Sequence, residues 1–186
     1  MEFLFFKKLE DSYRFARYRL YYKTENNNEK TYEIISRNKN LKHVKELQEE
    51  PTDSITLIMT NKEKDRILLN KEYRLAVADW VYNFPAGFID EGETIEAAGA
   101  RELYEETGLT LDHIEHISRD SYTAIGISNE KTACIIGTAS GDFKKSSSEY
   151  EEIHAGWFTK EQIRKLLKTE NFATQTQSYC HLWCNT

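Results

Sequence analysis

The sequence is poor in cysteine, in proline and in long apolar runs, and each scarcity excludes a class of protein. Its three cysteines are an odd and sparse set, which excludes a disulfide framework and fits a reducing compartment. Its two prolines argue against long disordered linkers. The apolar run over residues 3–6 is too short for the core of a signal peptide or for a membrane span. We therefore expect a cytoplasmic protein with no membrane association.

The chain also lacks a long basic run. It carries 25 Lys and Arg against 31 Asp and Glu, a net charge of −6. A surface that binds nucleic acid is usually strongly basic, so we expect no nucleic-acid partner. A polyphosphate substrate stays compatible with this charge, because a bound metal inverts the local field. The 39% hydrophobic content is enough for a core, and 186 residues suit one domain with a small extension.

Cys180, His181 and Cys184 lie close together near the end of the chain. Such a cluster raises the possibility of a bound metal. A lone C-H-x-x-C without a second ligand pair is a weak signal, and buried or inert thiols are the favoured interpretation.

The order of apolar and polar segments predicts an α/β (α+β) fold. Two strands joined by a turn at residues 25–28 open the chain, and the polar residues 39–53 suggest a linker. After it, strands and helices follow in the order strands, helix, strands, helix. The expected strands, with the two of the opening hairpin first, are residues 14–23, 30–36, 54–59, 66–69, 80–84, 114–122, 132–139 and 153–158, and the expected helices are residues 94–107 and 160–168. We expect a mixed sandwich over residues 51–186 and a small N-terminal β hairpin or sheet extension over residues 1–50.

The densest group of carboxylates lies between Gly87 and Leu109, in the segment GFIDEGETIEAAGARELYEETGL. Glu102 and Glu106 are one helical turn apart, and Glu105 lies on the neighbouring flank. Like charges at this spacing repel by about 0.2–0.5 kcal/mol per pair, and a cation between them removes that cost. Mg²⁺ is the natural candidate, because it favours carboxylate oxygens, carbonyls, water and substrate phosphate.

A solvated acidic face is the alternative interpretation of this helix. Against it, Leu103 projects at nearly the same angle as Glu102 and Glu106, so these carboxylates border the apolar side. The preceding Ala-Ala-Gly-Ala run lets a ligand or another backbone come close. Arg101 precedes Glu105 by four positions and can orient it through a charge-assisted hydrogen bond.

The same segment resembles the Nudix hydrolase signature, G-x5-E-x7-R-E-U-x-E-E-x-G-U, in which U is aliphatic. Every specified position matches at the required spacing. The matching residues are Gly87, Glu93, Arg101, Glu102, Leu103, Glu105, Glu106, Gly108 and Leu109. The resemblance implies a Nudix-type α/β/α sandwich with a mixed sheet. It also implies cleavage of a nucleoside diphosphate linked to another group, with Mg²⁺ or Mn²⁺ as the cofactor.

The resemblance further implies roles for single residues. Glu102 and Glu106 match the usual metal ligands, and Glu105 lies close by as a ligand or as a bridge to water. The backbone carbonyl of Ala86 commonly completes such a site. Glu93 and Arg101 match supporting residues, with Arg101 holding a glutamate in place.

Residues upstream of the signature resemble the ADP-ribose and sugar-nucleotide pyrophosphatase branch. Arg74 matches that branch's arginine, whereas Glu72 replaces its glutamine and Asn83 replaces its glutamate. Downstream, Ile125 stands where ADP-ribose enzymes usually carry proline. The N-terminal hairpin is similar to the branch's small β domain, which mediates dimerisation, so the resemblance implies a homodimer.

A catalytic base is expected on the polar loop over residues 146–152. Glu149 is the first candidate and Glu152 the second, as base or as an extra ligand. The alternative is that both are solvated loop charges.

Four further residues are candidates for substrate contact. Arg74 and Arg37 are candidates for phosphate or ribose binding, against ordinary surface ion pairing for Arg37. Trp80 is a candidate for stacking on a base, although strand aromatics are more often part of the core. Glu130 is either close to the phosphates or a solvated turn residue.

We therefore expect metal-dependent hydrolysis of ADP-ribose or a nucleoside diphosphate sugar to a nucleoside monophosphate and a sugar phosphate. The alternative enzymes are a nucleoside triphosphate or dinucleotide pyrophosphatase. A non-catalytic ligand sensor is the rival from another class, but such sensors usually lose the signature glutamates that this chain retains.

Overall fold

The computed structural model describes residues 1–185 and divides the chain into two compact units. The first unit comprises Met1–Asp53 with Asp120–Thr132, and the second comprises Ser54–Arg119 with the residues from Ala133 onward. The sequence predicted a single boundary at residue 50, and that prediction did not include the return of Asp120–Thr132 to the first unit. None of the helices within residues 1–185 is long and apolar enough to cross a bilayer.

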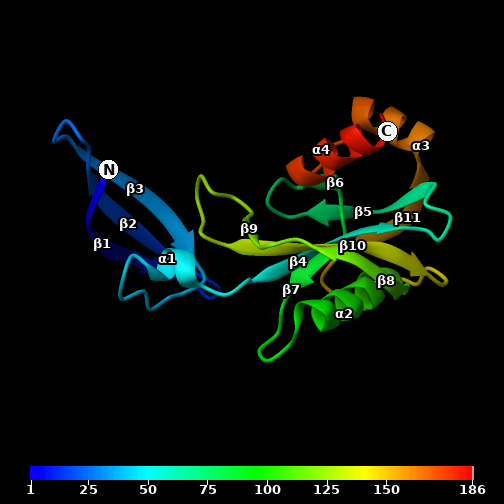
Figure 1. The fold of residues 1–186 in the computed structure, drawn as a ribbon, viewed down its shortest axis with the longest axis horizontal. Coiled ribbons are helices and arrows are strands. Elements are labelled where there is room, and N and C mark those ends of the chain that lie inside the picture. The colour runs from blue at the N-terminus through cyan, green and yellow to red at the C-terminus, as the bar shows by residue number, and fades with distance from the viewer. Residues whose placement is uncertain (186) are drawn as a thin grey trace. The chain divides into compact units, whose positions relative to one another are not determined.

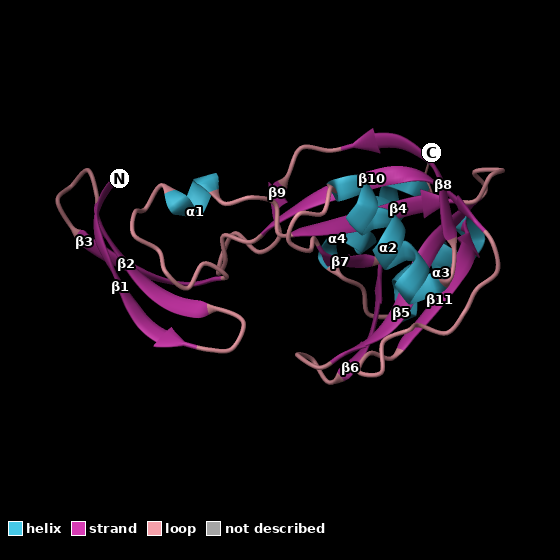
Figure 2. Ribbon diagram, turned by 90° about the horizontal axis from the view of Figure 1, so that it is seen from below, coloured by secondary structure: helices cyan, strands magenta, loops and turns pink. Residues whose placement is uncertain are grey.

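The first unit contains a three-stranded sheet in the order β1-β2-β3 (Figure 2). Its elements are β1 (Glu2–Asp11), β2 (Ala16–Lys23), β3 (Glu29–Ser36) and the short helix α1 (Glu46–Glu49). The expected hairpin is therefore present as β2 and β3, and β1 adds a strand that the sequence did not predict. Ala16, Tyr18, Leu20, Ile34 and Leu41 form the unit's core.

The expected linker over residues 39–53 is wrong, because this segment packs into the first unit. Leu41 is buried, and Leu47 of α1 packs against the same core. Lys131 fixes the end of the segment, since its Nζ donates to the carbonyls of Gln48 at 2.6 Å and Glu50 at 2.9 Å.

The second sheet has the strand order β11-β5-β4-β10-β8, with β6 beside β5, β7 beside β4 and β9 beside β10. Its strands are β4 (Ser54–Thr60), β5 (Arg66–Arg74), β6 (Asp79–Asn83), β7 (Ala86–Phe88), β8 (Thr110–Ile117), β9 (Ser121–Tyr122), β10 (Lys131–Ser140) and β11 (Ile153–Thr159). Register pairs Asn70 with Asn83 and Ile153 with Glu72. This places the start of β11 beside the polar end of β5.

Helices cover both faces of this sheet (Figure 1). Helix α2 (Ile95–Thr107) lies on one face, while α3 (Lys160–Thr169) and α4 (Thr174–Trp183) lie on the other. Two apolar clusters fill the layers. Leu57, Leu68, Leu103 and Ile135 belong to the α2 side, whereas Ile67, Leu69, Phe84, Ile163 and Cys180 belong to the α3 and α4 side. The sandwich expected from the sequence is confirmed.

Candidate active site

Helix α2 begins and ends where its own residues terminate a helix. The Thr94 side chain accepts a hydrogen bond from the Ala97 amide at 3.2 Å, which caps the first turn. Gly108 closes the last turn in the left-handed region, at φ 80°. Gly99 brings the helix close to the sheet, because a Cβ there would lie 2.4 Å from Cδ1 of Ile135. These features fix the turns that carry the carboxylates.

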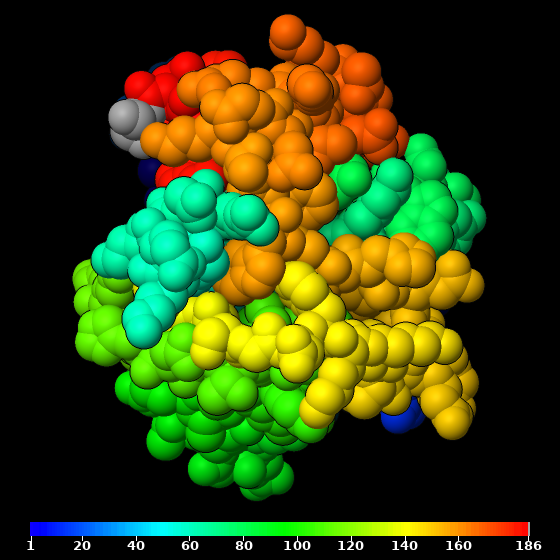
Figure 3. All heavy atoms as spheres, turned by 90° about the vertical axis from the view of Figure 1, so that its right-hand side faces the viewer, coloured from blue at the N-terminus to red at the C-terminus, as the bar shows by residue number. Residues whose placement is uncertain are grey.

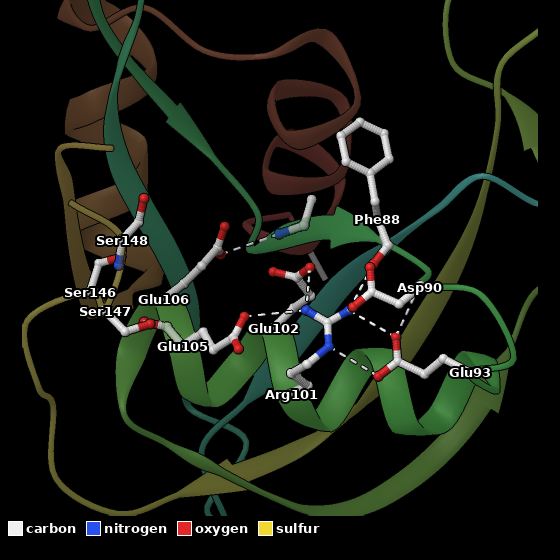
Figure 4. Close-up of polar contacts among 11 residues, drawn as sticks. Phe88, Asp90, Glu93, Arg101, Glu102, Glu105, Glu106, Ser146, Ser147 and Ser148 are labelled. Carbon is white, nitrogen blue, oxygen red and sulfur yellow. Dashed lines mark hydrogen bonds and ion pairs between the residues drawn. The ribbon is translucent and has the colours of Figure 1, made fainter. Parts of the chain in front are cut away.

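Arg101 ties the carboxylates of this region together (Figure 4). Its Nε and Nη2 donate to the two oxygens of Glu93 at 3.0 and 2.8 Å. Its Nη1 donates to Glu102 at 2.8 Å and to Glu105 at 3.2 Å. Nη2 also reaches the Phe88 carbonyl at 2.8 Å. The pairing with Arg101 lowers the pKa of Glu93 and raises that of the arginine. Arg101 therefore hydrogen-bonds three glutamates of this region at once, and its supporting role in a site stays a prediction.

Glu106 is the buried carboxylate of the group, with 8% of its surface exposed. Its Oε2 accepts hydrogen bonds from Asn70 Nδ2 at 2.8 Å and from the Ala86 amide at 3.3 Å. These contacts join α2 to β5 and β7. Asn70 is a functional candidate that the sequence did not reveal; its only signal is a polar residue directly after the apolar run of β5.

Negative charge accumulates around Glu106. Burial raises the pKa of its carboxyl well above the usual range, and the charges of Glu72, Glu102 and Glu151 raise it further. Burial also raises the pKa of Glu102, although the hydrogen bond from Arg101 opposes the shift. These carboxylates lie in or beside the C-terminal half of α2, where the helix dipole adds partial negative charge. A cation in this position would relieve the repulsion.

The residues present fit a divalent metal. Gly87 leaves room for the Glu102 carboxylate, because a Cβ on Gly87 would lie 1.9 Å from its Cδ. Asn70 Oδ1 is buried and has no hydrogen-bond partner within residues 1–185, so an acceptor oxygen faces this region unsatisfied. In the same part of the chain, no three acidic, histidine or cysteine side chains already converge on a metal position. Instead, one oxygen of Glu102 accepts a hydrogen bond from Arg101, and one oxygen of Glu106 accepts a hydrogen bond from Asn70.

Arg74 and Trp80 occupy different faces of the sheet. Arg74 Nη1 pairs with Glu72 Oε2 at 3.1 Å, at the end of β5. Trp80 lies opposite Tyr73 in the register and contacts its ring, with centroids 5.7 Å apart. Because side chains alternate along a strand, Tyr73 and Trp80 lie on the face opposite to Asn70 and Glu72. The structure therefore places Trp80 away from the acidic group.

Arg37 and Glu130 lie together in the first unit. Arg37 Nε donates to Glu130 Oε2 at 2.9 Å, and both side chains are about one third exposed or less. Thr123 Oγ1 also donates to Glu130 Oε1, at 3.3 Å. The two substrate-binding candidates from this unit thus neutralise one another, and a substrate contact for either stays a prediction.

A family model agrees with the site. The NUDIX domain model matches residues 50–179, a range that contains α2 and every carboxylate around Glu106. The chain belongs to the Nudix hydrolase family.

Curated Nudix relatives match over part of their lengths. NAD-capped RNA hydrolase NUDT12 from Macaca fascicularis is 33% identical over 102 residues, which cover 55% of this chain and 21% of that protein. ADP-sugar pyrophosphatase from Mus musculus is 38% identical over 76 residues, which cover 41% of this chain and 34% of that protein. The chain therefore spans about a fifth to a third of these relatives.

A solved structure shares the Nudix fold along nearly the whole chain. The crystal structure of an ADP compounds hydrolase superimposes with a TM-score of 0.72 and covers 98% of this chain and 91% of its own. Sequence identity is 17%, so this likeness concerns the fold.

In the loop before β11, the glutamate whose charge affects the acidic group is not the one that the sequence favoured. Glu151 acts electrostatically on both Glu102 and Glu106. The side chains of Glu149, Glu151 and Glu152 are all exposed, and the Glu152 carbonyl accepts a hydrogen bond from the Tyr73 amide at 3.0 Å. The roles of Glu149 and Glu152 stay predictions. The acidic composition of the loop was the available signal for Glu151, but it did not distinguish one glutamate from the next.

Cys180 and Cys184 lie in the apolar layer beneath α3 and α4. Burial raises the pKa of Cys180 to about 12 and also raises that of Cys184. His181 is exposed on the other side of the helix. Thiols held in their neutral form are poor metal ligands, so the interpretation as buried, inert thiols is the better one.

Proposed function

We propose that this chain hydrolyses the diphosphate bond of a nucleoside diphosphate linked to a sugar, such as ADP-ribose, with Mg²⁺ or Mn²⁺ as the cofactor. The products are a nucleoside monophosphate and a sugar phosphate. The observation that carries the proposal is the accumulation of carboxylates around Glu106, beside a glycine that leaves room for Glu102. Family membership and the name of the mouse ADP-sugar pyrophosphatase support it.

Glu102 and Glu106 would hold the metal, with Glu105 beside them and the Ala86 carbonyl completing the protein's share. When bound, the metal neutralises phosphate charge and lowers the pKa of a coordinated water. Arg101 keeps Glu102 and Glu105 oriented through its hydrogen bonds. The Asn70 amide holds one oxygen of Glu106, which leaves the other for ligation.

We assign removal of the water proton to Glu151 in preference to Glu149 and Glu152. Glu151 is the loop carboxylate whose charge raises the pKa of Glu102 and Glu106. A water oxygen forms a bond to one phosphorus, and the bond from that phosphorus to the bridging oxygen breaks. Glu151 accepts the water proton, and the bridging oxygen leaves as part of the second phosphate.

A second candidate substrate class is a dinucleotide that contains a diphosphate. The observation that favours it is that relatives named NAD-capped RNA hydrolases match this chain. Such a substrate presents the same bond to the same carboxylates and differs in the group beyond the second phosphate. A nucleoside triphosphate also presents a bond between two phosphates to these carboxylates, so that alternative substrate class stays open.

The test is product release from ADP-ribose, UDP- and GDP-sugars, dinucleotides and nucleoside triphosphates, each with Mg²⁺, Mn²⁺ or chelator. We expect metal-dependent formation of a nucleoside monophosphate and a sugar phosphate. Reaction in ¹⁸O-labelled water identifies the attacked phosphorus. A Glu102→Gln variant serves as the control for contaminating enzymes. Folded protein that cleaves no diphosphate with either metal would leave the ligand sensor as the better interpretation.

A further inference from the structure

The loop between β10 and β11 is fastened to the C-terminal end of α2. The Lys144 amide donates to the Thr107 carbonyl at 2.9 Å, and the Ser147 amide donates to the Glu105 carbonyl at 2.9 Å. The last carbonyls of a helix have no partner within the helix, so these loop amides satisfy two of them. Figure 3 shows the yellow atoms of this loop beside the green atoms of the α2 region, and Figure 4 shows residues 146–148 beside Glu105.

Side chains and a glycine strengthen this attachment. Lys144 Nζ donates to Tyr104 Oη at 2.9 Å and lies 4.8 Å from the centroid of that ring. Gly108 allows the close approach, because a Cβ there would lie 2.8 Å from the Lys144 backbone nitrogen. The loop thus rests directly on the turn that ends the metal-binding helix.

A second attachment follows five residues after Ser147. The Glu152 carbonyl accepts the Tyr73 amide at 3.0 Å, and Ile153 then pairs with Glu72 at the start of β11. Glu151 therefore lies between Ser147, which is bonded to α2, and Glu152, which is bonded to β5. A segment this short, fixed at both ends, leaves the Glu151 backbone little freedom.

The attachment opposes a repulsion. Glu149, Glu151 and Glu152 make the loop acidic, and Glu151 interacts unfavourably with Glu102 and Glu106. Charge by itself would drive such a loop away from the site. Backbone hydrogen bonds to α2 hold it there, and the one cation of the attachment, Lys144, is bonded to the Tyr104 hydroxyl rather than to a carboxylate.

We propose that Ser147 is a positioning residue whose backbone amide, bonded to the Glu105 carbonyl, holds the loop that carries Glu151 against the C-terminal end of α2. This rests on the proposed function, in which Glu151 accepts the proton of the attacking water. Ser147 acts through its main chain, because its hydroxyl lies 3.4 Å from the same carbonyl and adds little.

The test compares Ser147→Pro, which removes the amide donor, with the conservative Ser147→Ala, which retains it. We expect S147P to lower kcat by roughly 10- to 100-fold, as expected for a catalytic group misplaced by about 1 Å, with KM within about threefold. S147A should keep kcat within about threefold of the wild-type value. Equal losses in both variants would contradict a main-chain role.

A double-mutant cycle with Glu151→Gln identifies the target of the amide. If Ser147 acts through Glu151, S147P lowers kcat by less than about threefold in the E151Q background. The same fold-loss in both backgrounds would refute the proposal. Wild-type protein that cleaves no substrate would instead refute the proposed function.

Hydrogen exchange tests the attachment without any activity and without a variant. The Ser147 and Lys144 amides should exchange far more slowly than the same amides in an unstructured peptide. Exchange at the unstructured rate would refute the attachment, even if the enzyme is active or if S147P does not fold.

Discussion

Gly87→Ala should disable the site while leaving the fold intact. A Cβ on Gly87 would lie 1.9 Å from Cδ of Glu102 and 2.1 and 2.3 Å from its two oxygens. Carbon atoms in contact are separated by about 3.5 Å, so the carboxylate has to retreat by roughly 1.6 Å. Mg²⁺ tolerates little departure from its preferred geometry, and an error of about 1 Å can cost 10²-fold in rate. We expect kcat/KM to fall about 100-fold.

The stability cost of the same change should be small. The displaced atoms are the end of a flexible side chain, and the loss is a hydrogen bond from Arg101 at 2.8 Å. We expect the free energy of unfolding to fall by about 1 kcal/mol or less. The assay combines steady-state hydrolysis over a Mg²⁺ series with urea unfolding. Calorimetric titration with Mn²⁺ measures metal binding independently of activity.

The matched control is Gly87→Ala in a Glu102→Ala background, where the clashing atoms are gone. There the alanine at position 87 should change Mn²⁺ affinity and stability by less than it does in the wild type. The reasoning fails if G87A retains wild-type kcat/KM, or if it costs the same in both backgrounds.

Three further outcomes are expected. Glu106→Gln should cut turnover at least about 100-fold. Because the folded pKa of Glu106 is raised, the metal-free wild type should lose stability as pH rises above about 4.3, and E106Q should lose less in urea titrations; parallel pH profiles would contradict this. Arg101→Lys should lower the free energy of unfolding by about 1–3 kcal/mol, since it loses the forked bonds to Glu93, and a wild-type urea midpoint would argue against it. Light scattering should give twice the 21.8 kDa chain mass, whereas a monomer would refute the homodimer.

Local signals explain why α2 could be predicted closely. Thr94 provides a capping hydroxyl, Gly108 provides a residue tolerant of positive φ, and the residues between them favour a helix. Every group needed to start and stop this helix lies within its own sequence. The carboxylates on it were therefore predictable as a set, and so was the pairing of Arg101 with Glu105.

Elements without such signals were missed. Strand β1 has register irregularities between Phe3 and Phe5 and between Lys8 and Glu10, so its partly buried residues recur every third position rather than every second. Helix α4 has no side-chain cap at Ala173 and carries β-branched threonines in its first turn. Tertiary contacts stabilise it instead: it packs against the apolar layer of the second unit, and Thr176 hydrogen-bonds Asn83 and Phe84.

The site divides in the same way. The residues contributed by α2 follow from one segment, whereas Asn70, Glu72 and Glu151 depend on the pairing of strands β5 and β11. The register of β11 and β5 brings Ile153 opposite Glu72. This pairing sets where Glu151, two residues before Ile153, lies. A change of one residue in that register would turn Glu72 to the other face of the sheet. Sequence spacing alone could not decide among Glu149, Glu151 and Glu152.

The attachment of the loop also bears on how the site tolerates its own charge. In the metal-free protein, the charges of Glu102 and Glu151 add to the effect of burial and raise the pKa of Glu106. A metal reverses the sign of the interaction, so the loop that backbone hydrogen bonds hold against repulsion would be drawn to the site when a cation is present. Positioning Glu151 through main-chain amides keeps the same geometry in both states, because amide hydrogen bonds do not depend on the charge at the centre.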